Sequence, residues 1–150
     1  MMLCEAATYY KSKGLTLCDQ MENIYKKYGY YKEGLVSITM EGSDGAEKIK
    51  ELMENLRKNV VKEFGSYKVI KEKDYKTSVS KDISSKVEEQ INLPKSNVLY
   101  YELENDAWCC MRPSGTEPKI KFYMGIKGTS QEDATLKLEN LKKAVLEKVQ

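Results

Sequence analysis

The sequence predicts an α+β domain: an antiparallel sheet of about four strands with two long helices packed on one face, preceded by a helical hairpin. Segments in which apolar and polar residues alternate indicate half-buried strands. Two long segments carry apolar residues three and four positions apart, which is the spacing of helices that pack on a core. The length of 150 residues suffices for one domain with an appendage. Helices gathered on one face of an antiparallel sheet define the α+β class.

The first 28 residues predict two helices. Residues 2–13 form the first, which Gly14 ends. No Ser, Thr, Asp or Asn stands before it to accept bonds from its first N–H groups, so we expect the chain to have been cut from something longer. The second helix starts after Thr16, which with Asp19 approximates a capping box, and Gly29 ends it. Its apolar stripe consists of Leu17, Met21, Ile24 and Tyr28.

A shift in composition near residues 29–34 marks the expected boundary between residues 1–29 and a domain over residues 30–150. Alternation over 36–41 predicts the first strand. A turn over 41–45, in which Asp44 is the expected cap, leads into a long helix.

That helix is expected to run to about Phe64, with an apolar face that carries Ile49, Met53, Leu56 and Val60. Residues 67–75 predict a strand. The mainly polar residues 76–97 predict a connecting loop, with a short helix over 84–91 as an alternative.

The last third of the chain has the clearest patterns. Alternation over 99–104, the turn residues Asn105-Asp106 and a return strand over 107–111 predict a hairpin. A further strand follows, whose buried side should carry Ile120, Phe122, Met124 and Ile126. Gly128 ends this strand, and Thr129 or Ser130 caps a C-terminal helix. The apolar face of that helix consists of Ala134, Leu138, Leu141 and Val145.

Composition excludes several classes of chemistry. The chain has no histidine, so it can hold neither a Ser-His nucleophile nor a His-ligated zinc ion. Its four cysteines show no C-x-x-C spacing, and we expect reduced thiols, no metal site and a cytoplasmic protein. No apolar run approaches the roughly 20 residues that span a membrane. A net charge of +2 gives no sign of a nucleic-acid partner.

One loop has residue types that suit the binding of a tetrahedral dianion. Arg112 offers a permanently charged planar fork, and Ser114 and Thr116 offer hydroxyl donors. Gly115 lets successive backbone N–H groups point at one spot, and Lys121 on the following strand adds positive potential. The alternative is a plain surface turn, a type rich in Ser, Gly and Pro, with Arg112 paired to Glu117.

The same segment resembles a known family. The run RPSGTEPKIKFY over residues 112–123 is similar to the phosphate-binding loop and following strand of the α-D-phosphohexomutases, the phosphoglucomutase/phosphomannomutase family. EAATYYKSKG over 5–14 and YKKYGYY over 25–31 resemble the end of the third domain of bacterial phosphoglucomutases and the run into their fourth. The resemblance implies that residues 1–29 are a helical remnant of the third domain and residues 30–150 the C-terminal phosphate-binding domain.

Such a fourth domain has a fold like that of the TATA-box-binding protein. The resemblance implies that Arg112, Ser114, Gly115 and Thr116, and less strongly Lys121, bind the non-reacting phosphate of a phosphosugar such as glucose 1-phosphate, glucose 6-phosphate or the bisphosphate intermediate. The parent enzyme would interconvert hexose 1- and 6-phosphates with a phosphoserine and Mg²⁺ on its missing domains 1–3. This chain would hold no cofactor and no catalytic residue, and alone it would be inactive.

Other interpretations of the function stay open at this point. The parent could be a phosphomannomutase or phosphopentomutase-type relative. The chain could also be a stand-alone binding or interaction domain with the 2–28 hairpin as its partner-binding element. A nucleic-acid-binding sheet is disfavoured because Glu102 and Glu104 lie on a candidate exposed face.

Overall fold

The computed structural model describes residues 1–42 and 44–149 of the chain. Ser43, part of the predicted turn, and Gln150 lie outside the described residues. The described helices are α1 (Met2–Ser12), α2 (Leu17–Tyr28), α3 (Gly45–Lys58) and α4 (Gln131–Val149). The described strands are β1 (Tyr30–Thr39), β2 (Glu63–Phe64), β3 (Tyr67–Asp74), β4 (Val79–Asp82), β5 (Glu88–Gln90), β6 (Leu99–Leu103), β7 (Trp108–Pro113) and β8 (Lys119–Gly128).

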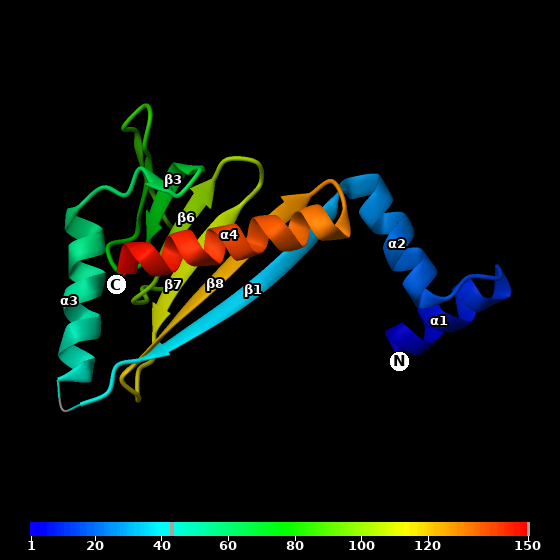
Figure 1. The fold of residues 1–150 in the computed structure, drawn as a ribbon, viewed down its shortest axis with the longest axis horizontal. Helices are drawn as coiled ribbons and strands as arrows, with labels where there is room; N and C mark the ends of the chain where they lie inside the picture. The colour runs from blue at the N-terminus through cyan, green and yellow to red at the C-terminus, as the bar shows by residue number, and fades with distance from the viewer. Residues whose placement is uncertain (43, 150) are drawn as a thin grey trace.

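The strands form one open antiparallel sheet in the order β1-β8-β7-β6-β3-β4-β5, with β2 paired to β3. This confirms the α+β class, but the sheet has about twice the predicted number of strands within the described residues. In Figure 1, α4 lies across the sheet and α3 stands at its end. A single core joins both helices to one face of the sheet. Its fully buried members include Met53, Leu99, Tyr101, Met111, Ile120, Phe122, Met124, Leu141 and Val145.

The predicted helical hairpin is present, and it projects from the end of β1 (Figure 1). The helix α1 begins without a side-chain cap, whereas Thr16 and Asp19 form the predicted capping box of α2. Neither helix buries a residue. None of the helices in residues 1–42 and 44–149 is both long and apolar enough to cross a membrane.

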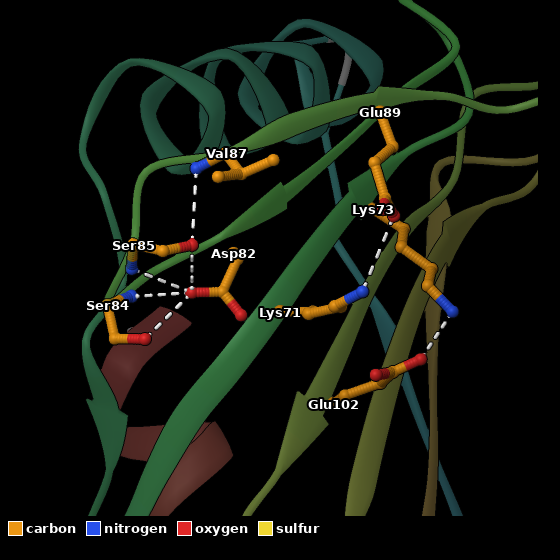
Figure 2. Close-up of polar contacts among 8 residues, drawn as sticks. All are labelled: Lys71, Lys73, Asp82, Ser84, Ser85, Val87, Glu89 and Glu102. Atoms are coloured by element: carbon orange, nitrogen blue, oxygen red, sulfur yellow. Dashed lines mark hydrogen bonds and ion pairs between the residues drawn. The ribbon is translucent and has the colours of Figure 1, made fainter.

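The structure corrects the polar segment 76–97, which was predicted as a loop or a short helix. It contains the hairpin β4–β5, whose strands are joined by a tight turn at Asp82. Figure 2 shows Asp82 accepting hydrogen bonds from the backbone and hydroxyl groups of Ser84 and Ser85. These bonds lower the pKa of Asp82 to about 2. The hairpin has no apolar stripe that the sequence could show. Ion pairs stabilise it, such as the pair between Lys71 of β3 and Glu89 of β5 (Figure 2).

The helix α3 ends earlier than predicted, at Lys58 in place of about Phe64. Asn59 is already extended, and the β-branched pair Val60-Val61 favours extended backbone. Val60, predicted on the apolar face, is exposed, while Phe64 is buried in β2 against the ring of Tyr101.

Asp44 precedes α3, but its side chain accepts no capping hydrogen bond. Its carboxylate instead pairs with Lys48 at 2.8 Å. At the start of α4, by contrast, Ser130 accepts a hydrogen bond from the N–H of Asp133, so the predicted cap is confirmed.

A bulge in β3 turns an acidic side chain toward the core. The register between β3 and β6 shifts between Val69 and Lys71, which places Glu72 opposite Tyr101. Among the described side chains, one carboxylate oxygen of Glu72 and the hydroxyl of Tyr101 are buried without a hydrogen-bond partner. Burial is the main cause that raises the pKa of Glu72 to about 6, and the nearby Asp74 carboxylate adds to it.

We expect Glu72→Gln to stabilise the chain above pH 6 by about 1 kcal/mol. The pKa of Glu72 is higher in the folded chain than in the unfolded chain. The protonated carboxyl therefore contributes its full stability below pH 4.5, and this contribution is lost as the pH rises through about 6. Urea denaturation of both forms from pH 4 to pH 8 measures the difference, which should shrink toward zero at the acidic end. A difference that stays constant across this range would contradict the assignment.

Candidate functional site

The predicted loop lies where β7 ends and β8 begins. The antiparallel pairing of these strands places Arg112 directly opposite Lys121 on the open face of the sheet. Together with loop residues 113–116 and Tyr123, they line a hollow of about 300 Å³. All five residues predicted from the sequence therefore border one hollow: Arg112, Ser114, Gly115, Thr116 and Lys121. Tyr123 was missed, although the two-residue period of β8 places it on the face of Lys121.

Backbone hydrogen bonds hold the loop closed. The N–H of Ser114 donates to the carbonyl of Lys119 at 2.7 Å, and the carbonyl of Pro118 accepts from Met40 at 2.9 Å. The Ser114 hydroxyl oxygen accepts from the N–H groups of Thr116 and Glu117 at 3.5 and 3.4 Å. Its own O–H stays available as a donor to a ligand.

Gly115 has an ordinary backbone conformation in this loop. Its φ lies outside the left-handed region, so the turn does not depend on glycine for its backbone conformation. A Cβ at this position would meet no atom within 4 Å. The absent side chain leaves space at the mouth of the hollow, where a ligand can approach the backbone.

Positive charge in the hollow is uncompensated. Glu117 pairs with Lys119 at 3.1 Å and not with Arg112. Within residues 1–42 and 44–149, neither Arg112 nor Lys121 has an ion-pair partner. Like charges directly opposite on neighbouring strands destabilise a sheet, so this pair favours a bound anion. The Arg112–Glu117 pair expected for a plain surface turn does not form.

The groups that line the hollow include a guanidinium, an ammonium and hydroxyl groups. In the described part of the chain, no three His, Cys, Asp or Glu side chains are grouped so that they could hold a metal ion. The thiol of Cys110 lies beside the hollow, opposite Tyr123 in the neighbouring strand. Burial raises its pKa, and the charge of Arg112 opposes that shift. The hollow is therefore equipped to bind and orient an anion through positive charge and hydrogen-bond donors.

The fold and the hollow together define a small α+β domain with a candidate anion-binding loop. No protein-family model matches the chain. Over 137 residues it is 37% identical to the phosphoglucomutases of Staphylococcus aureus strains USA300 and NCTC 8325, and 36% identical to that of strain MSSA476. These matches cover 91% of this chain and 25% of each relative, so the chain spans about a quarter of the length of the curated relatives it matches. The chain is therefore related to the phosphoglucomutases over nearly its whole length, consistent with a C-terminal domain of such an enzyme.

Proposed function

We propose that this chain is the C-terminal domain of a phosphoglucomutase-type enzyme and that its loop holds the phosphate of a phosphosugar that is not being transferred. The uncompensated cross-strand pair of Arg112 and Lys121 is the observation that carries the proposal. A phosphate dianion between them would neutralise both charges. The planar fork of Arg112 would bind two of its oxygens, while the Ser114 hydroxyl and the N–H of Gly115 would bind others.

In the whole enzyme, binding of the non-reacting phosphate would contribute to the reaction although the loop does not contact the reacting atoms. Binding energy from a part of the substrate that does not react can supply orientation and closure at the part that does. The loop would thus position a hexose 1- or 6-phosphate, or its bisphosphate, while other domains transfer the phosphoryl group. The phosphoserine and Mg²⁺ of the parent enzyme would belong to those domains, and no residue of this chain is assigned to them.

Residues 1–29 are proposed as the end of the preceding domain. The α2 residues Met21, Ile24 and Tyr28 are exposed, and they would pack on domains 1–3 of the same polypeptide. Residues 30–150 would form the fourth domain. Its strands β1, β8, β7 and β6, with α3 and α4, would be the unit of TATA-box-binding-protein type. Free thiols at all four cysteines support a cytoplasmic location.

Titration of the isotopically labelled chain with glucose 1-phosphate tests the proposal. We expect amide NMR shifts at residues 114–116 that saturate, because these residues line the hollow at the proposed phosphate position. Glucose without phosphate should leave these amides unshifted. Mixing the chain with glucose 1-phosphate should give no glucose 6-phosphate, and turnover at an ordinary enzymatic rate would contradict its role as a binding domain alone. Absence of loop shifts at millimolar ligand would remove the phosphate assignment.

A further inference from the structure

Tyr123 lines the same hollow as the loop but is not part of the loop. It lies two residues beyond Lys121 in β8, on the same face of the sheet, so about 7 Å separates the two positions along the strand. Residues 113–116 and the pair of Arg112 and Lys121 border the loop end of the hollow, and Tyr123 borders the end away from it. A phosphate held between Arg112 and Lys121 would fill the loop end and leave the Tyr123 end free.

The strands on either side of Tyr123 place uncharged side chains beside it. Leu35 of β1 and Cys110 of β7 lie directly opposite Tyr123, and residues paired in this way share one face of the sheet. Leu35 is exposed on that face. Burial raises the pKa of the Cys110 thiol, so the thiol is uncharged at neutral pH. The open face of the sheet therefore changes from charged to uncharged side chains two residues beyond Lys121.

The ring of Tyr123 is open to contact with a ligand. In the part of the chain that the structure describes, no lysine ammonium lies over this ring and no second aromatic ring packs against it. Tyr31 and Tyr100, on the same sheet, differ in this respect, because ammonium groups lie 5.3 and 5.6 Å from their ring centroids. Tyr123 thus combines a place in the hollow with a ring that other side chains leave uncovered.

We propose that Tyr123 contacts the sugar ring of a bound phosphosugar and so makes the site prefer a sugar phosphate to inorganic phosphate. This inference rests on the proposed function, because it requires a phosphate held by the loop. The sugar is joined to that phosphate through an ester oxygen, so its ring lies next to the phosphate, at the uncharged end of the hollow. The C–H face of a pyranose ring is apolar and packs against an aromatic side chain. Tyr123 is thus assigned as a residue that binds and selects the substrate.

Calorimetric titration of the full chain with two probes, glucose 1-phosphate and inorganic phosphate, tests this assignment. The wild-type chain should bind glucose 1-phosphate about tenfold more tightly than inorganic phosphate. Tyr123→Ala should remove that tenfold preference and leave the affinity for inorganic phosphate unchanged. Tyr123→Phe keeps the ring and should retain the preference. Tyr123→Thr gives a second measurement should Tyr123→Ala fail to fold, because threonine is favoured in strands, and it should lose the preference as well.

A matched control and the two probes keep the possible failures apart. Tyr9→Ala removes an exposed tyrosine of α1 and should change neither affinity. If the wild-type chain binds neither probe in the millimolar range, the proposed phosphate site and the assignment of Tyr123 are both wrong. If the chain binds both probes equally well, or if Tyr123→Ala weakens both by the same factor or neither, Tyr123 does not contact the sugar. The phosphate site would stand in that case.

Discussion

Arg112→Ala is expected to weaken binding of glucose 1-phosphate at least about 30-fold, equivalent to about 2 kcal/mol. The variant removes the charged fork and leaves Lys121 as the only cation of the cross-strand pair. Calorimetric titration of the wild-type chain and the variant measures the ratio of dissociation constants. If the two constants agree within a factor of two, Arg112 is not part of a phosphate clamp.

Folding and binding can be separated for this variant. Arg112 is exposed and has a like charge opposite it, so Arg112→Ala should leave the urea midpoint unchanged or slightly raised. Lys119→Ala provides a matched control. It removes a cation from the same face of β8, but one that is already paired with Glu117. It should change phosphate affinity much less than Arg112→Ala.

The second large effect concerns stability. We expect Arg57→Ala to lower the free energy of unfolding by about 3 kcal/mol or more. Arg57 Nε donates to Asp74 at 3.2 Å, and both side chains are nearly buried. The same guanidinium donates to Asn97 at 2.7 Å. Without it, the Asp74 carboxylate stays buried near Glu72 with no cation to balance it. Urea denaturation at pH 7 measures the loss.

A double variant shows whether the unbalanced charge is the cause. In Arg57→Met/Asp74→Asn the charge is gone, while the amide oxygen introduced at position 74 can still accept from the N–H of Lys76, as Asp74 does at 3.0 Å. The double variant should therefore be more stable than Arg57→Met alone. Lys48→Ala breaks the exposed pair with Asp44 and should lower the free energy of unfolding far less than Arg57→Met does, because solvent screens an exposed ion pair. Equal losses in the double variant and in Arg57→Met would refute this account.

The parts of the fold that sequence reasoning predicted are those held by burial. Leu99, Tyr101 and Leu103 are buried in alternate positions of β6, and Ile120, Phe122, Met124 and Ile126 are buried in β8. The hairpin turn at Asn105-Asp106 also formed, with both residues at positive φ. Where a stripe of apolar side chains decides the structure, its period is visible in the sequence.

The sequence predictions were wrong where hydrogen bonds and ion pairs, and not apolar burial, determine the structure. The β4–β5 hairpin depends on hydrogen bonds of Asp82 and on cross-strand ion pairs, neither of which leaves a periodic signal. The bulge that turns Glu72 inward has no sequence marker either, because Ile70 resembles an ordinary strand residue. The candidate site was predictable as a set of residue types. That Arg112 lies directly opposite Lys121 could not be predicted, because it depends on the pairing register of β7 and β8.

The junction between α2 and β1 has a mechanical consequence. The Tyr30 hydroxyl donates to Glu22 at 2.6 Å, and the Tyr30 ring stacks on that of Tyr25. The hairpin is thus fastened to the first residue of a strand that pairs with β8 over its full ten residues, from Gly128 to Lys119. A rotation of the hairpin would be transmitted along this pair of strands to the end of the sheet where the proposed phosphate-binding loop begins.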